Sequence, residues 1–174
     1  MPTFPLFPKA HDGGVAPAQL PHITPCTPCV VVPSRRRAWD DPAARFPIRA
    51  GGAYTGPFSR KCQAYAERFH AGAWCILDPH NGFMWPDELI YRPHDRCIYQ
   101  SGVRPLDLTR FREDASDRGL YGHDVIIALG GQCFVSLMEK LFSGSKVSAP
   151  LAGTGGIGRM MRVLDHAISS DERL

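Results

Sequence analysis

The sequence predicts a single α/β domain with three layers, in which a mostly parallel sheet carries helices on both faces. Short apolar runs typical of buried strands alternate with segments whose apolar residues recur every three or four positions, as in amphipathic helices. This alternation favours a parallel sheet covered on both faces. The 174 residues are enough for one domain with its own core, and no internal repeat is evident.

The composition is that of a soluble globular protein, with 44% hydrophobic and 21% charged residues. No apolar run approaches the roughly 20 residues of a membrane helix, and the first residues lack the basic start of a signal peptide. We therefore expect a cytoplasmic protein without a membrane partner. The net charge of +3 permits nucleic-acid binding without requiring it.

Residues 1–28 are rich in Pro and Gly, so we expect an N-terminal arm followed by an α/β domain at 29–174. Cys26 and Cys29 form an isolated CxxC pair. A zinc site needs a second pair of ligands. The favoured interpretation is two packed thiols at the entrance of a strand, and we expect neither a metal nor a cofactor.

The β-branched run from Cys29 to Val32 predicts the first strand. Arg35, Arg36 and Arg37 follow it directly. They belong either to a solvated turn or to a phosphate contact, because guanidinium groups bind phosphate oxygens bidentately. The sequence leaves both interpretations open.

After an expected loop at 38–52, a helix is predicted to begin near Pro57, with Thr55 as a possible cap. Tyr54 and Thr55 would then lie at a helix N-terminus, which favours anions. The helix has one apolar face, formed by Phe58, Cys62, Tyr65, Ala66 and Phe69.

The run Trp74 to Leu77 predicts a buried strand, and it changes abruptly into Asp78-Pro79-His80-Asn81-Gly82. The carboxyl ends of strands in an open α/β sheet are where ligands bind. Residues two apart on extended backbone point the same way, so Asp78 and His80 are expected to face one site as acid–base or charge-stabilising groups. In the alternative interpretation, Asp78 caps a turn through its own backbone.

Residues 85–93 are irregular and aromatic, 107–118 predict a polar helix, and 124–129 are the strongest strand signal. A helix is expected after Gly130-Gly131, and another at the end of the unit 147–159. Core packing is expected for the apolar face of the first, Phe134, Leu137, Met138, Leu141 and Phe142, and for that of the second, Ile157, Met160, Met161, Leu164 and Ile168.

The glycine stretch 153–158 precedes a helix, so it either holds a phosphate or makes a tight turn. It matches neither a Walker loop nor a dinucleotide fingerprint. Thr154 and Arg159 favour an anion or sugar contact. We expect this turn, the turn at Gly130-Gly131 and the pair Asp78 and His80 to share one crevice.

An ordered set of segments resembles a small bacterial and phage family of unknown function, similar to YaaA-like proteins and to domains of archaeosine-type transglycosylases. The resemblance covers about residues 29–168. Its segments are 31–36, 53–58, 64–68, 74–77, Gly82, 86–88 and 150–158. It implies a pocket that processes a modified nucleobase, since some relatives are thought to act on hypermodified phage DNA.

Two segments depart from the family pattern. Pro33-Ser34-Arg35-Arg36 stands where the family has Ser-Cys-Gly-Lys, and Asp78-Pro79-His80-Asn81-Gly82 stands where it has Ser-Ala-Lys-(His/Tyr)-Gly. The family's Ser and Lys roles are therefore not transferred. Leu77 to His80 is locally similar to the water-activating segment of uracil-DNA glycosylases, which is an analogy only.

The leading hypothesis is a DNA glycosylase that excises a modified base, such as glucosylated hydroxymethylcytosine, from phage DNA in antiviral defence. Its expected catalytic residues are Asp78, His80 and Asn81. Its expected phosphate contacts are Arg35, Arg36, Arg37 and Arg159. The expected substrate contacts are Ser34, Tyr54, Thr55, Gly82, Phe83, Trp85, Gly130, Gly131, Thr154 and Gly155.

Two alternatives remain open. The crevice could belong to a binding module for a nucleotide or modified base that carries out no reaction. It could instead belong to a hydrolase or transferase acting on the N-glycosidic bond of free nucleosides or nucleotides. Tight binding without base release would favour the first, and activity on mononucleotides alone would favour the second.

Overall fold

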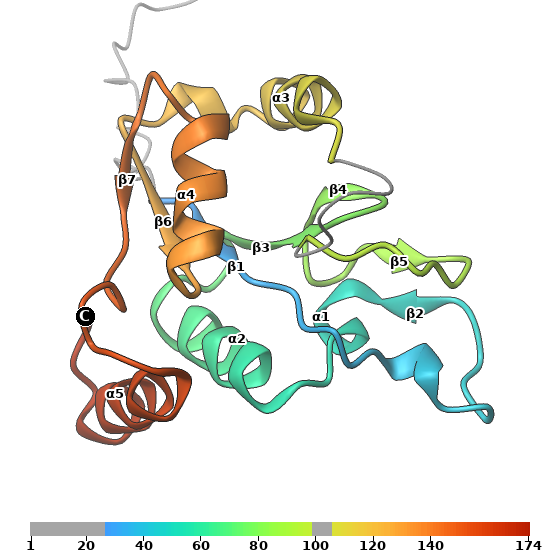
Figure 1. The fold of residues 1–174 in the computed structure, drawn as a ribbon, viewed down its shortest axis with the longest axis horizontal. Helices are drawn as coiled ribbons and strands as arrows, with labels where there is room; N and C mark the ends of the chain where they lie inside the picture. The colour runs from blue at the N-terminus through green and yellow to red at the C-terminus, as the bar shows by residue number, and fades with distance from the viewer. Residues whose placement is uncertain (1–26, 99–105) are drawn as a thin grey trace, which may run out of the picture.

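A five-stranded sheet forms the centre of the computed structural model, which describes residues 27–98 and 106–174 (Figure 1). The strand order is β4-β3-β1-β6-β7. All neighbours pair in parallel except β3 and β4, which are antiparallel. The strands are β1 (Cys29–Val31), β3 (Trp74–Asp78), β4 (Gly82–Met84), β6 (Val125–Leu129) and β7 (Lys146–Ser148).

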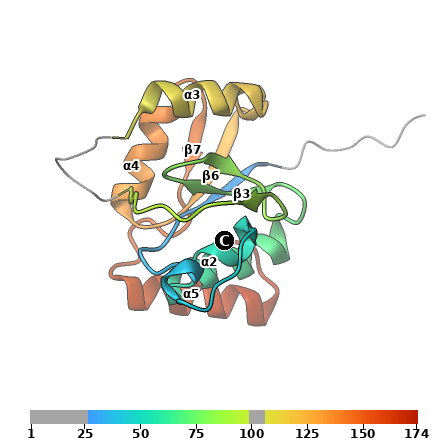
Figure 2. The ribbon, with the colours of Figure 1, turned by 90° about the vertical axis from the view of Figure 1, so that its right-hand side faces the viewer.

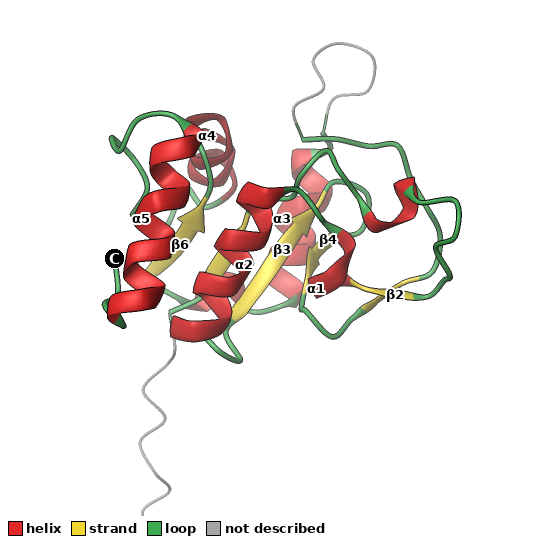
Figure 3. Ribbon diagram, turned by 90° about the horizontal axis from the view of Figure 1, so that it is seen from below, coloured by secondary structure: helices red, strands yellow, loops and turns green. Residues whose placement is uncertain are grey.

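Helices cover both faces of this sheet, which confirms the predicted α/β class (Figure 2). α2 and α5 lie together on one face, as the view from below in Figure 3 shows, and α3 and α4 pack against each other on the opposite face. Their bounds are α2 (Pro57–Phe69), α3 (Leu108–Asp117), α4 (Gln132–Leu141) and α5 (Ile157–Ser170). One core cluster, in which β1 is fully buried, joins the layers.

The expected loop at 38–52 and the irregular stretch at 85–93 contain short elements that the sequence did not reveal. β2 (Ile48–Arg49) pairs antiparallel with β5 (Leu89–Ile90). The remaining elements are η1 (Ala38–Asp40), α1 (Ala50–Ala53) and η2 (Leu120–Gly122). None of these elements is long enough to show a hydrophobic period.

The topology reverses between β1 and β6. From β1 the chain passes through α2 to β3 on one side, and it later returns to β6 on the other side of β1. The helix that follows β1 and the helix that follows β6 lie on opposite faces. A crevice therefore opens beyond the carboxyl ends of these two strands, which is where open α/β sheets bind ligands.

The predicted N-terminal arm lies outside the described residues up to position 26, as does Cys26 of the CxxC pair, while Cys29 is buried within β1. Thr55 does not cap α2, because the N-cap is Gly56 and no side chain bonds there. In the described part of the chain, no helix is long and apolar enough to cross a membrane.

Candidate functional site

A pocket of about 590 Å³ lies at the carboxyl ends of β1 and β6. Its size suits a ligand as large as a nucleotide. We call it the switch pocket. Its lining residues follow β1, surround the start of α2, open α4 and belong to α5. They are Val32, Pro33, Ser34, Arg35, Gly56, Pro57, Phe58, Ser59, Gly131, Gln132, Cys133, Ile157 and Met161.

Three helices begin at this pocket, and each has a glycine as its N-cap. Gly56, Gly131 and Gly156 precede α2, α4 and α5, and none provides a side-chain capping hydrogen bond. The first N–H groups of a helix have no acceptor within the helix. Pro57 has no N–H, so the free donors at the start of α2 begin at Phe58, whereas α4 and α5 also offer the N–H of their first residue. These donors and the helix dipoles favour an anion, and exposed Arg35 adds a full charge.

Most of the pocket wall is apolar. Phe58 and Met161 are half-buried, and Ile157 is 58% exposed. The prediction that Ile157 lies on the buried side of its helix is therefore wrong, and Met161 is buried only in part. Both side chains line the pocket, where a flat ring can pack against them. The pocket thus combines an anion-binding region with an apolar one.

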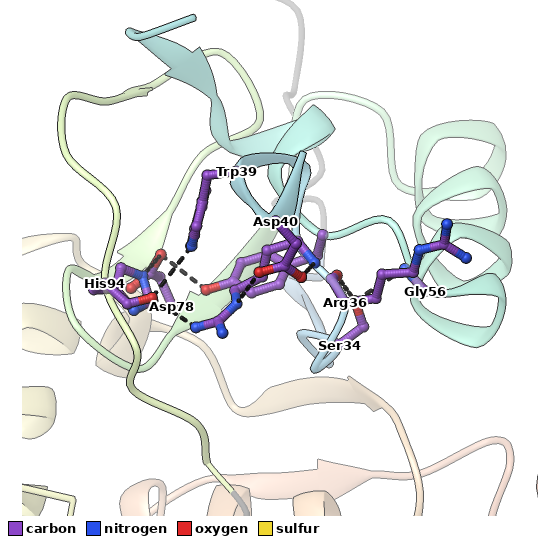
Figure 4. Close-up of polar contacts among 9 residues, drawn as sticks. Ser34, Arg36, Trp39, Asp40, Gly56, Asp78 and His94 are labelled. Atoms are coloured by element: carbon purple, nitrogen blue, oxygen red, sulfur yellow. Dashed lines mark hydrogen bonds and ion pairs between the residues drawn. The ribbon is translucent and has the colours of Figure 1, made fainter. Parts of the chain in front are cut away.

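Ser34 holds the loop after β1 against the start of α2, and it lines the pocket as predicted. Its hydroxyl oxygen accepts a hydrogen bond from the Gly56 N–H at 3.0 Å and donates one to the Arg36 carbonyl (Figure 4). Below it, Ser59 donates to the Val32 carbonyl at 2.8 Å. These bonds fix the position of the α2 N-terminus relative to β1.

Asp78 does not face the switch pocket. Its side chain is buried, and both carboxylate oxygens accept hydrogen bonds from the protein. Oδ1 accepts from the backbone N–H of His80 at 2.7 Å and of Asn81 at 2.8 Å. Oδ2 accepts from the Tyr54 hydroxyl at 2.9 Å and lies 3.2 Å from His94 Nε2 (Figure 4). The geometry is that of the turn-capping alternative.

Electrostatics agree with a structural carboxylate. Burial alone raises the pKa of Asp78, but the hydrogen bond and charge of His94 and the two backbone N–H donors outweigh it and bring the pKa below its usual value. Burial, followed by the negative charge of Asp78, raises the pKa of Tyr54 well above its usual value. The ionised Asp78 therefore organises the surrounding loops.

His80 and Asn81 lie in the turn that follows β3. His80 is exposed and its ring stacks on His94, with 5.2 Å between the ring centroids. The expected common direction of Asp78 and His80 is wrong, because β3 ends at Asp78 and the backbone turns there. Burial, followed by the positive charge of His94, lowers the pKa of His80.

Several predicted substrate contacts belong to the core instead. Tyr54 and Phe83 are 1% and 0% exposed, so neither can stack on a ligand. Gly82 has φ +95° and lies against Asp114, and Gly130 lies against the Phe134 ring, so both serve close packing. Of the two adjacent glycines in the turn after β6, only Gly131 lines the pocket.

The remaining predicted contacts lie outside the switch pocket. Thr55 is half-buried and does not line the pocket, and Trp85 lines a separate hollow. Thr154 donates to the Leu151 carbonyl at 2.8 Å within its own turn. Gly155 and exposed Arg159 are not among the lining residues. The expected single crevice shared by Asp78, His80 and both glycine turns is therefore wrong.

A second pocket of about 170 Å³ adjoins the first through Ser34 and Arg35, which line both. We call it the arginine pocket. Its lining residues are Ser34, Arg35, Arg37, Asp95, Arg96 and Cys97. Of the three arginines after β1, Arg35 and Arg37 line a pocket, whereas Arg36 is exposed and lines neither pocket. Sequence reasoning missed Arg96, because it lies in a loop without periodicity.

Within the described residues, no three His, Cys, Asp or Glu side chains lie close enough together to hold a metal ion. No Asp or Glu is among the described residues that line the switch pocket. The pocket is therefore equipped to bind an anion with an apolar ring. It does not itself provide the carboxylate that glycosidic cleavage usually requires.

One curated protein shows a significant similarity. The chain is 26% identical over 147 residues to the uncharacterized protein YfjM of Bacillus subtilis (strain 168). The aligned residues cover 84% of this chain and 97% of YfjM. No family model matches the chain. No solved structure matches it either.

Proposed function

We propose that this protein binds a nucleotide in the switch pocket and recognises it without cleaving it. The observation that carries the proposal is the composition of the pocket wall. Three uncapped helix N-termini and Arg35 favour a phosphate group, while Phe58, Ile157 and Met161 offer apolar contact to a base. A ligand with both parts uses the whole wall.

The location supports the same class of ligand. Mononucleotides and dinucleotides bind open α/β sheets at the point where the strand order reverses, with phosphates at a helix N-terminus. Here the reversal lies between β1 and β6, and the pocket lies at that point. A nucleoside without phosphate would leave the helix N-termini without a charged partner.

A filling variant tests the proposal. Gly131 lines the pocket on extended backbone, and an added Cβ there meets no atom within 4 Å. Gly131→Leu should therefore fold and occupy the space of the ligand. Gly144→Leu is the matched control, because Gly144 is an exposed glycine beyond the other end of α4 and its added Cβ also meets nothing.

The measurement is calorimetric titration with the natural nucleoside 5′-monophosphates and with the corresponding nucleosides. At least one monophosphate should bind, and its nucleoside should bind about tenfold more weakly or worse, because charged hydrogen bonds contribute about 1.5–3 kcal/mol. Gly131→Leu should abolish this binding and Gly144→Leu should retain it. Binding that Gly131→Leu leaves intact would refute the site.

Base excision is a second candidate, favoured by one carboxylate near the pocket. Asp95 lines the adjoining arginine pocket together with Arg35, and it is exposed. A nucleotide extruded from phage DNA into the switch pocket would bring its sugar toward this rim, where Asp95 could stabilise positive charge on the sugar.

Mass spectrometry of products decides between the two candidates. The substrate is phage DNA that carries glucosylated hydroxymethylcytosine, with free nucleotides assayed in parallel. Release of free base by the wild type, lost in Asp95→Asn, would establish base excision and displace the binding proposal. Release from mononucleotides alone would indicate the nucleotide-hydrolase alternative. Nucleotide binding without release from either substrate supports recognition alone.

A further inference from the structure

The arginine pocket is lined by three arginines, and a mononucleotide bound in the switch pocket has no second phosphate for them to contact. Arg35, Arg37 and Arg96 line it together with one carboxylate, Asp95. Among the described residues, neither Arg35 nor Arg96 has an ion-pair or side-chain hydrogen-bond partner. Arg37 is paired with Asp40, so Arg35 and Arg96 are the two guanidinium groups around this hollow whose charge an anion would compensate.

Contacts with neighbouring residues fix the position of the Arg37 guanidinium group. Its Nη1 donates to the His94 carbonyl at 2.6 Å, and its guanidinium carbon lies 5.7 Å from the centre of the Trp39 ring. Its Nε lies 3.5 Å from a carboxylate oxygen of Asp40 (Figure 4). The Trp39 indole N–H donates to the same His94 carbonyl at 3.2 Å. Because these contacts fix the guanidinium group beforehand, little side-chain entropy is lost when it binds an anion.

Ser34 and Arg35 line both pockets, so the two hollows lie on either side of the same two residues. A ligand whose phosphate lies at the helix N-termini can therefore extend past Arg35 into the arginine pocket. A mononucleotide has no second phosphate to place there, whereas a nucleic-acid strand has one on the next nucleotide. The planar fork of an arginine matches the oxygens of such a phosphodiester.

We propose that the arginine pocket binds the neighbouring phosphate of a nucleic-acid strand whose nucleotide occupies the switch pocket. This inference rests on the proposed function. It narrows the ligand of the switch pocket from any nucleotide to a nucleotide within a nucleic-acid strand. The loop that carries Arg96 then acts as the element that distinguishes a strand from a mononucleotide.

The test compares thymidine monophosphate, thymidine diphosphate and a 5′-phosphorylated thymidine trinucleotide by calorimetric titration. The wild type should bind the trinucleotide about tenfold more tightly than either small ligand, because the additional phosphate gains charged hydrogen bonds. Arg96→Gln should remove most of this advantage and change monophosphate affinity by no more than about twofold. It should also lower the slope of log K against log salt by about 0.7, as expected for one lost phosphate contact on a single strand.

Arg49→Gln is the control, because Arg49 is an exposed arginine in β2 that lines neither pocket. It should leave all three affinities unchanged. A trinucleotide that binds no more tightly than thymidine diphosphate overturns the strand inference, as does an equal weakening of all ligands by Arg96→Gln. Monophosphate binding that Gly131→Leu abolishes would still support the proposed function in that case, whereas no nucleotide binding at all would refute the proposed function itself.

Discussion

The buried Asp78 carboxylate accepts a hydrogen bond from the Tyr54 hydroxyl at 2.9 Å and so joins the end of β3 to the segment that precedes α2. The same carboxylate oxygen lies 3.2 Å from His94 Nε2. The His94 carbonyl in turn accepts from Arg37 and Trp39. The carboxylate thus joins the segment before α2 to the loop beyond β5, and His94 in that loop contacts the chain after β1. Asp78 itself lines neither pocket.

Removing this carboxylate should reduce stability. Asp78→Ala leaves the Tyr54 hydroxyl and two backbone N–H groups without their acceptor in a buried site, which should lower the free energy of unfolding by about 3–5 kcal/mol. The measurement is urea unfolding. Asp117→Ala, at an exposed position in the last turn of α3, should change the free energy by less than about 0.5 kcal/mol. Unchanged stability in Asp78→Ala would contradict the structural role.

His70 should make stability depend on pH. Burial, followed by the positive charge of Arg173, lowers the pKa of His70, which is only 2% exposed. The unfolded chain therefore binds a proton more readily, so stability is full above the unfolded pKa of about 6.5 and falls as the pH drops through the folded value.

His70→Phe, which keeps a ring in the core, should lose less stability than the wild type between about pH 7 and pH 5. Urea unfolding at a series of pH values measures the difference. His80 also has a lowered pKa, but it is present in both proteins and drops out of the comparison. Parallel pH profiles for the two proteins would show that His70 contributes nothing.

Gly82 should tolerate no side chain. Its φ is +95°, and an added Cβ would overlap the Asp114 carboxylate, which accepts the Phe83 N–H at 2.6 Å and the Arg118 Nε at 3.0 Å. Gly82→Ala should therefore cost more than the roughly 1–2 kcal/mol of left-handed strain alone. Gly119→Ala is the control that measures this strain alone, because Gly119 has φ +71° and an added Cβ meets no atom within 4 Å. Equal losses in Gly82→Ala and Gly119→Ala by urea unfolding would exclude the Asp114 contact.

The sheet and its covering helices were predictable because their signals are local. The apolar run before Asp78 and the run at Val125–Leu129 became parallel strands beside β1, and four expected helices formed. The antiparallel β4 and the pair β2 and β5 were missed. Each spans only two or three residues, so tertiary pairing and not sequence period determines them.

The site was less predictable because it depends on where the chain turns after each strand. Alternation along a strand placed Asp78 and His80 on one side, but the turn begins immediately after Asp78 and separates them. The bonds from Tyr54 and His94 to Asp78 span 24 and 16 residues, and sequence spacing does not reveal them. Ser34, Arg35 and Gly131 could be predicted to line a pocket because they come soon after β1 and β6, the strands that flank the reversal of strand order.

Alkylation of Cys133 is the most direct test of nucleotide binding in the switch pocket. Cys133 is exposed and lines this pocket at the start of α4, whereas half-buried Cys97 lines the arginine pocket and provides an internal reference. A nucleoside monophosphate at ten times its Kd should slow the reaction of Cys133 with a maleimide about tenfold, read by peptide mass spectrometry, and should leave Cys97 unaffected. An unchanged Cys133 rate at nucleotide concentrations that saturate the calorimetric signal would contradict the account.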